Sequence, residues 1–285
     1  MGRASARRPV TRVRAGVVTA VRPDTVAGEE PLEIRVGGRP LAVTMRTPGH
    51  DMDLAMGFLL GEGLIASGAD VAAMRYCVGR DGALDDDGRL TYNVLDVTLA
   101  AGVPAPTAQD ARAFYTTSSC GLCGKASIDA VRLRSRFRVD DDPLRVAPAV
   151  VCALPESLRA AQRLFATTGG LHAAALAGPD GELGAVREDV GRHNAVDKVI
   201  GAAARAARLP LAGRILVVSG RASFELVQKA LMAGIPMLAA VSAPSTLAVD
   251  LAQEAGMTLA GFVRGDTLNL YAGAHRVTAL PGAGG

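Results

Sequence analysis

The chain has 285 residues, of which 49% are hydrophobic and 21% are charged, and its formal net charge is +3. This length predicts about two domains, and a high apolar content with a low net charge excludes a mainly disordered protein. No stretch of about 18 residues is free of charges, Gly and Pro, so we expect no membrane-spanning helix.

The positive charge is concentrated at the start of the chain. Residues 1–14 contain five Arg and no acidic residue, whereas the rest of the chain has 26 basic and 28 acidic side chains. Such a body lacks the basic face that duplex DNA requires, so no nucleic-acid partner is expected. Residues 1–14 are predicted to be a disordered basic arm, and without an apolar segment they do not resemble a secretory signal.

The four cysteines are too few and too scattered for a secreted disulfide framework. We therefore expect a cytoplasmic protein with reduced thiols, in which Cys77 and Cys152 are small buried side chains. Lys occurs only three times against 28 Arg. Each Lys is weak evidence for a site that favours a compact ammonium group over a guanidinium group.

In chain order, the first half predicts an α+β arrangement. Strands are expected at residues 17–21, 32–36 and 41–45, near 74–79 and near 90–98. Gly37-Gly38 is a turn signal between the second and third strands. A mostly buried helix is expected to begin near Asp51 and end at Gly61–Gly63. Residues 81–89 form an acidic loop, and residues 101–109 a possible linker.

The second half alternates between strand and helix patterns. A helix is expected to begin at Pro155 and end before Gly169, and Asn194 resembles the cap of a helix that reaches about residue 208. Further strands are expected at 171–177, 182–188, 214–219, 235–241, 257–262 and 267–272, with helices at 222–233 and 246–255. This order predicts a three-layer α/β sandwich with a mixed sheet.

The turns that follow three of these strands are candidates for ligand binding, because ligands of open α/β sheets bind beyond the carboxyl ends of the strands. These turns, 219–221, 242–246 and 262–267, contain small residues, hydroxyl groups and two Arg. Together with helix N-termini, such groups suit a phosphate or a nucleotide. Alternatively, Ser219, Ser242 and Ser245 only cap helices.

A polar run, 187–194, joins a predicted strand to a helix. Glu188, Asp189, Arg192 and His193 could bind a ligand or transfer protons there. The alternative is a salt-bridged loop in which Asn194 caps the helix.

The strongest local feature is a Gly-rich loop with Cys120 and Cys123, followed by Lys125 near a predicted helix start. A thiol near a helix N-terminus and an ammonium group has a lowered pKa and is a better nucleophile. Three interpretations remain open on these residues: a zinc site, dithiol–disulfide exchange and a persulfide carrier. Zinc is the weakest, since no second C-x-x-C and no His-x-Glu occur.

Four stretches together resemble the FdhD family, the formate dehydrogenase accessory sulfurtransferases. They are MRTPGHDMDLAMGFLLGEGLI at 45–65, the loop TSSCGLCGKAS, EDVGRHNAVDKVIG at 188–201, and the segment 219–265. The resemblance covers residues 15–278, and the joint occurrence of four long motifs in family order is far more specific than C-x-x-C alone.

This resemblance implies a cytidine-deaminase-like sandwich without the catalytic zinc, plus a smaller N-terminal α+β domain, in a homodimer. We therefore expect a disordered arm at 1–14, the N-terminal domain at 15–108, the deaminase-like domain at 109–280 and a disordered tail at 281–285. No structural metal and no membrane partner are expected.

The resemblance also implies a function. The family carries sulfur from a cysteine desulfurase to the molybdenum cofactor of formate dehydrogenase, a bis-molybdopterin guanine dinucleotide, for which GDP is a mimic. Cys120 would carry the persulfide and Cys123 would assist. The expected cofactor-binding residues are Ser219, Gly220, Arg221, Ser242, Phe262, Val263, Arg264, Gly265, Asp266 and Thr267. Two rival functions are a dithiol–disulfide oxidoreductase and a cofactor-binding chaperone without sulfur transfer.

Overall fold

A computed structural model of the chain describes residues 4–77, 92–107 and 135–278. Its N-terminal part has α1 (Asp51–Gly61) and a short 3-10 helix, η1 (Gly68–Asp70). The strands there are β1 (Ser5–Arg14), β2 (Val17–Ala27), β3 (Glu30–Val36), β4 (Arg39–Arg46), β5 (Val71–Tyr76) and β6 (Val94–Leu99). β1 and β2 form a two-stranded sheet, and the other four pair in the order β4-β3-β6-β5.

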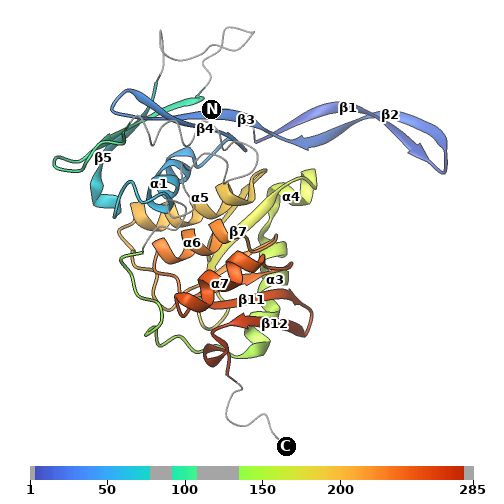
Figure 1. Ribbon diagram of the computed structural model, residues 1–285. Helices are drawn as coiled ribbons and strands as arrows, with labels where there is room; N and C mark the ends of the chain where they lie inside the picture. Colours follow the sequence, from blue (N-terminus) through green and yellow to red (C-terminus); the bar gives the residue numbers. More distant parts are fainter. Residues whose placement is uncertain (1–3, 78–91, 108–134, 279–285) are drawn as a thin grey trace, which may run out of the picture.

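The C-terminal part is built on a six-stranded mixed sheet of order β12-β11-β10-β9-β7-β8 (Figure 1). Its strands are β7 (His172–Ala177), β8 (Leu183–Asp189), β9 (Ile215–Val218), β10 (Met237–Ala240), β11 (Thr258–Arg264) and β12 (Thr267–Ala272). The accompanying helices are α3 (Pro148–Ala161), α4 (Arg163–Thr168), α5 (Arg192–Arg205), α6 (Phe224–Met232), α7 (Thr246–Glu254) and η3 (Ala274–Arg276).

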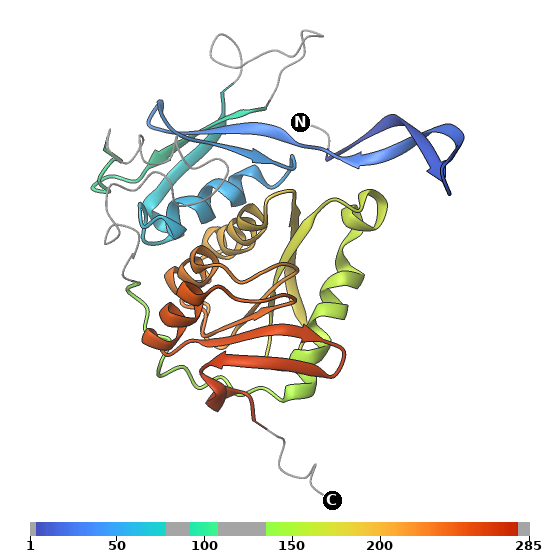
Figure 2. The same ribbon diagram turned by 45° about the vertical axis from the view of Figure 1, so that its right-hand side comes forward.

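Helices cover both faces of this sheet, so the predicted three-layer α/β sandwich is confirmed (Figure 2). The alternation along β9 shows why. Ile215 and Val217 belong to a cluster with α3, whereas Leu216 and Val218 belong to a second cluster with α1, α5 and α6. Because strand residues alternate between faces, a strand that is buried on both faces has a continuous apolar sequence.

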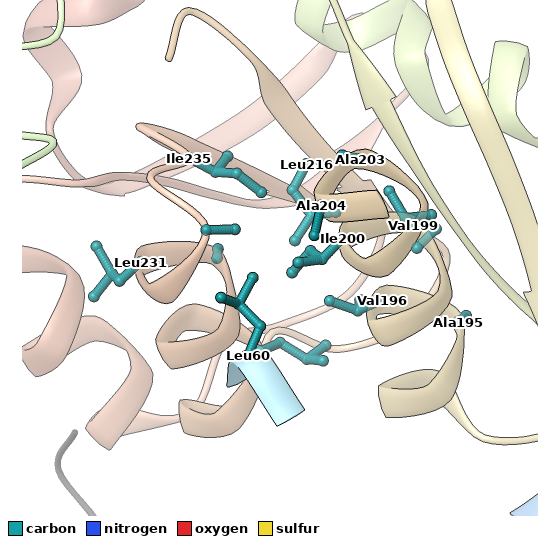
Figure 3. Packing of buried hydrophobic residues seen from close by; sticks show 14 of the residues in the cluster. Leu60, Ala195, Val196, Val199, Ile200, Ala203, Ala204, Leu216, Leu231 and Ile235 are labelled. Atoms are coloured by element: carbon teal, nitrogen blue, oxygen red, sulfur yellow. The ribbon is translucent and has the colours of Figure 1, made fainter. Parts of the chain in front are cut away.

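The second cluster joins the two parts of the chain. Leu60 of α1 lies near Val196 and Ile200 of α5 (Figure 3), and Leu231 of α6 belongs to the same cluster. The N-terminal sheet contributes Leu32, Ile34 and Leu95 to the same core. The proposed domain division, between residues 108 and 109, and the predicted tail, 281–285, both lie outside the described residues. The domain boundaries therefore stay predictions.

The N-terminal arm differs from the prediction of disorder. β1 pairs with β2 along its whole length, and Arg14 faces Val17 across a two-residue turn. Ala15 and Gly16 both have positive φ (49° and 80°), which is typical of a type I′ hairpin turn. Ala-Gly is a weaker sequence signal for a hairpin turn than Asn-Gly. The many Arg also make the strand pattern of the β-branched residues between them difficult to recognise.

The helix expected at Pro155 begins earlier, at Pro148, and Pro155 lies inside it. Pro148 is the better start because it stands at the first helical turn, where its missing N–H is not needed. The helix also stops at Gln162, whose backbone (φ −78°, ψ 84°) separates α3 from α4.

Asn194 is not the cap of α5, which begins after Gly191. Asn194 is buried in the first turn of the helix, where its amide donates hydrogen bonds to Met45 O (2.8 Å) and Asp189 Oδ1 (3.1 Å). Its tertiary partners in the N-terminal part explain its position better than local capping.

Candidate functional site

The three predicted ligand-binding turns meet at one edge of the six-stranded sheet. β9, β10 and β11 are parallel, so their carboxyl ends coincide. Backbone hydrogen bonds join the turns, because Ser242 N donates to Gly220 O (3.3 Å) and Phe262 N donates to Ser242 O (3.2 Å). The expectation that these turns lie together is confirmed.

A cavity of about 860 Å³ lies between this edge and α3. Since β7 is antiparallel to β9 and β8 is antiparallel to β7, the start of β7 and the end of β8 reach the same edge. His172 and Val190 accordingly line the cavity with Ser219 and Arg264. Such a volume is typical of a small-molecule or cofactor site.

The structure separates the predicted cofactor-binding residues into two groups. Ser219, Val263, Arg264 and Gly265 line the cavity. The others lie in the same turns but are not among the described residues that line it: Gly220, Arg221, Ser242, Phe262, Asp266 and Thr267.

Phe262 has an unusual backbone for its residue type. Its φ is +51°, a left-handed conformation that bulky residues rarely adopt, and 39% of its surface is exposed. A bulge in the β11–β12 pairing covers this position. The bulge explains how Phe262 can point outward while Val263 is buried between two exposed neighbours.

The cavity contains residues that the sequence analysis did not select. The guanidinium of Arg159 stacks on the Phe165 ring at 4.0 Å from its centroid, and both residues line the wall that α3 and α4 provide. Glu156, one turn before Arg159, lines the same wall. Helical spacing of polar residues on α3 is the only sequence signal for this wall, and the expected helix start at Pro155 obscured it.

Gln162 also lines the cavity, and 4% of its surface is exposed. Its Nε2 has no hydrogen-bond partner among the described residues. A buried amide nitrogen without a partner costs about 1–3 kcal/mol. This residue is therefore a candidate ligand contact, and no sequence pattern pointed to it.

His172 lines the sheet edge of the cavity. Burial lowers its pKa below the ordinary value, and the positive charges of Arg192 and His193 lower it further. The imidazole is therefore mainly neutral near pH 7, so that it can both accept and donate a hydrogen bond.

Much of the polar run 187–194 holds the fold together. Asp189 is fully buried and pairs with Lys198 Nζ (2.7 Å), and its carboxylate also accepts hydrogen bonds from Thr47 N and Gly191 N. Glu188 accepts hydrogen bonds from Leu164 N (2.9 Å) and Phe165 N (2.7 Å) at the start of α4. For Asp189 and Glu188, these contacts favour the alternative of a structural, salt-bridged loop.

His193 has a different environment on the helical side of the edge. Its Nε2 lies 2.7 Å from Glu225 Oε2 and 3.3 Å from Ser223 Oγ, at the N-terminus of α6. Burial raises the pKa of Glu225, but the hydrogen bond and charge of His193 outweigh burial and leave this pKa below its ordinary value. The pair is partly exposed and outside the residues that line the cavity.

Two of the three lysines fit the expectation of special sites. Lys198 pairs with Asp189, and Lys229 pairs with Asp197 at 2.7 Å, all of them buried. A compact ammonium group fits such a site better than a guanidinium group. Lys125 lies outside the described residues.

Cys120 and Cys123 also lie outside the described residues, so their role stays a prediction. Cys152 is buried beside the cavity, where burial and then the charge of Asp266 raise the pKa of its thiol. It is therefore a poor nucleophile. Cys77 was expected to be buried, but it is only half-buried.

In the described part of the chain, no three His, Cys, Asp or Glu side chains are grouped as they would be around a metal ion. Among the helices of the described ranges, none has the length and apolarity to cross a bilayer.

Comparisons with known proteins agree on one family. The chain is 59% identical to a sulfur carrier protein FdhD from Streptomyces coelicolor over 285 residues, which cover 100% of this chain and 99% of that protein. It is also 59% identical to a sulfur carrier protein FdhD from Mycobacterium tuberculosis, over 98% of this chain and all of that protein.

A solved structure shares the fold. A protein from Desulfotalea psychrophila, named as a formate dehydrogenase accessory protein, matches with a TM-score of 0.74 and 22% identity, over 96% of this chain and 100% of that chain. The model of the FdhD/NarQ family matches residues 27–278. With this match and the full-length similarity, the chain belongs to the FdhD/NarQ family.

Proposed function

We propose that this chain is a sulfur carrier that uses Cys120 to deliver sulfur to the molybdenum cofactor of formate dehydrogenase. One observation carries the proposal: a chain with the Cys120–Cys123 pair is 59% identical over its full length to a sulfur carrier protein. The accessory role named for the Desulfotalea protein supports the choice of acceptor.

In the first proposed step, the Cys120 thiolate attacks the outer sulfur of a persulfide on a cysteine desulfurase. A new S–S bond forms on Cys120 while the old S–S bond breaks, and the thiolate of the desulfurase leaves. The step is electron-neutral and needs no added oxidant. Lys125 and the predicted helix start would favour the attacking thiolate form.

In the second proposed step, the Cys123 thiolate attacks the inner sulfur of the Cys120 persulfide. Hydrosulfide leaves as the sulfur ligand for the molybdenum, and Cys120 and Cys123 become a disulfide. The two electrons that reduce the transferred sulfur come from the thiol pair, so a dithiol reductant must then restore it.

The cavity is the proposed docking site for the guanine nucleotide end of the cofactor, which is the cargo. Arg264 and Arg159 can pair with phosphate, and Ser219 and the neutral His172 can orient the ligand by hydrogen bonds. The unpartnered amide nitrogen of Gln162 is the observation that best fits a polar ligand here. The family resemblance further suggests a cytoplasmic homodimer.

A titration of the purified protein with GDP tests this docking site. Arg264→Ala removes a charged partner of phosphate and is expected to weaken GDP binding about 10- to 100-fold, because a hydrogen bond to a charged group contributes about 1.5–3 kcal/mol. Cys120→Ala is expected to bind GDP as the wild type does.

Arg39→Ala, which removes an exposed Arg on the N-terminal sheet, is the matched control and should leave binding unchanged. Equal GDP affinity of the Arg264→Ala variant and the wild type would contradict the assignment of Arg264. Loss of GDP binding in Cys120→Ala would contradict separate sites for sulfur and cargo.

A further inference from the structure

The hairpin of β1 and β2, residues 5–27, projects from the body of the molecule, and we call it the arm (Figures 1 and 2). Among the described strands, β1 and β2 pair with each other and with no third strand. Within the described ranges, neither outer edge of the ribbon pairs with another strand, so its backbone groups can pair with another chain.

The arm is amphipathic. Residues opposite each other in the register share a face. One face is apolar towards the tip of the arm, where it carries Pro9, Thr11, Val13, Val18, Val21 and Pro23, and it carries Arg7 and Thr25 nearer the base. The other face carries four of the five Arg, Arg8, Arg12, Arg14 and Arg22, together with Asp24, Val10, Val17 and Val26. Exposure reaches 57% for Val13, 65% for Val18 and 68% for Val21.

The exposed valines of the arm, on either face, have no core of their own. Of the eight large hydrophobic side chains that are exposed in the described part of the chain, five lie in the arm: Val13, Val17, Val18, Val21 and Val26. An isolated two-stranded hairpin is marginally stable in water. Exposed apolar groups gathered on a projecting ribbon are typical of an interaction surface.

The charge of the arm indicates the kind of partner. Five Arg and one Asp give residues 5–27 a net charge of +4, which complements an acidic surface. A lipid surface is less well matched, because the arm has no Trp, Tyr, Phe or Lys to anchor at the interface. Nucleic acid would leave the valines exposed, whereas a protein can cover them and pair with a strand edge.

The base of the arm is next to the cavity. β2 contacts α4, and a Cβ on Gly170, which lines the cavity, would lie 3.8 Å from the Ala27 methyl group. Gly28 N also donates a hydrogen bond to Ala4 O, which closes the base of the ribbon. A protein that binds along the arm as far as its base would lie beside the wall of the proposed cargo site.

We propose that the arm docks an acidic surface of the acceptor enzyme and so holds that enzyme at the mouth of the cofactor cavity. This proposal rests on the proposed function, because it takes the cavity to hold the cargo that the acceptor receives. The apolar face supplies buried area in the complex, and the basic face supplies attraction that salt weakens.

Binding of the full-length chain to immobilised apo-formate dehydrogenase, measured by biolayer interferometry, tests the proposal. Arg12→Ser/Arg14→Ser is expected to lower the affinity about tenfold or more at low salt and to reduce its salt dependence. The control Arg39→Ser/Arg208→Ser removes two exposed Arg from the body and should bind as the wild type does.

A second variant, Val13→Ser/Val18→Ser/Val21→Ser, keeps every charge and is expected to accelerate dissociation. Serine also weakens the cross-strand pairs, so the charge variant decides the question. GDP titration and persulfide loading are measured on the same variants. Wild-type GDP affinity and wild-type persulfide loading in these variants would show that the proposed cargo site and the cysteines are intact. A failure of the proposed function would instead appear in these two measurements on the wild type.

Unchanged apoenzyme affinity in both arm variants would overturn the proposal. If the variants alter only the sedimentation of the chain by itself, the arm is an interface between copies and the proposal fails. If they abolish only binding to vesicles of anionic phospholipid, the arm is a membrane contact and the proposal also fails.

Discussion

Asp53 shows how one buried carboxylate joins distant segments. Its oxygens lie 2.6 Å from Arg205 Nη1 and 3.1 Å from Arg187 Nη2, so it joins α1 to α5 and β8. Burial alone raises the pKa of Asp53, but hydrogen bonds from His50, Arg205 and Arg187 outweigh it and lower this pKa to about 2.

This lowered pKa predicts a pH-dependent stability. Because the pKa falls from 3.8 to about 2 on folding, the ionised carboxylate stabilises the fold by roughly 2 kcal/mol above pH 4, and this contribution is lost as the pH falls from about 4 towards 2. Asp53→Asn should lower the free energy of unfolding in urea at pH 7, and the difference from wild type should shrink at pH 3.

Asp250→Asn, at an exposed position on α7, is the control and should change little at either pH. A wild-type free energy of unfolding for Asp53→Asn at pH 7 would contradict the role of this ion-pair cluster. So would a deficit that is equally large at pH 7 and pH 3.

Single residues also show the limits of sequence analysis. The scarcity of Lys predicted special sites, and Lys198 and Lys229 are indeed buried beside carboxylates. The sequence could not identify Asp189 and Asp197 as their partners, because such pairs depend on how helices pack. Gln162 gave no signal at all, since its importance comes from the cavity around it.

At the scale of elements, α1 and α5 cross at an unusually close distance. A Cβ on Gly57 would overlap the carbonyl oxygen of Asp197, and a Cβ on Gly201 would overlap that of Asp53. Glycine is required at both positions by this close approach and not by φ. The two helices carry the core that joins the N-terminal part to the six-stranded sheet.

Gly201→Ala tests this crossing, because we expect it to lower the free energy of unfolding, whereas Gly→Ala in a helix usually raises it. Within an exposed helix, replacing Gly by Ala stabilises by roughly 1 kcal/mol. Here the added methyl group must push α1 away, and we expect the free energy of unfolding to fall by about 1–3 kcal/mol or more. Chemical denaturation measures the change.

Gly184→Ala is the control for this change. Its Cβ would lie 3.5 Å from Leu176 O, an ordinary contact, so its stability should stay within about 0.5 kcal/mol of wild type. A stabilised Gly201→Ala variant would contradict the close approach of the two helices.

The sequence predicted the elements after residue 171 well, because buried strands and helices alternate there with clear Gly and Pro boundaries. The sequence-based prediction was wrong where tertiary contacts determine the local structure. Residues 1–14 were predicted to be disordered, although a strand was expected at 17–21, because β1 is rich in Arg and has no core to pack against. The start of α3 was misplaced because Pro155 was taken for the first turn, when Pro148 occupies it.

At the scale of the whole molecule, the sheet edge brings distant residues into one site. The sequence predicted the turns after β9, β10 and β11, because strand–helix repeats imply parallel strands with a common edge. It could not predict the opposite wall, formed by Arg159, Gln162 and Phe165, because only the packing of α3 on the sheet creates it. Four of the ten predicted cofactor-binding residues line the cavity.

The proposed function combines three parts of the molecule. The cavity would hold the cargo, the arm would hold the acceptor, and Cys120 and Cys123 would supply the sulfur. Only the thiol chemistry distinguishes a sulfur carrier from a chaperone that binds the cofactor without sulfur transfer. A dithiol–disulfide oxidoreductase would share the thiols but would not carry sulfur.

The central claim is that Cys120 carries a persulfide, and the most direct measurement is mass spectrometry of the intact protein after incubation with a cysteine desulfurase and cysteine. We predict a gain of one sulfur atom that dithiothreitol removes, that maps to Cys120, that persists in Cys77→Ala and that is absent from Cys120→Ala. No gain on Cys120 or Cys123, with an active desulfurase present, would contradict the account.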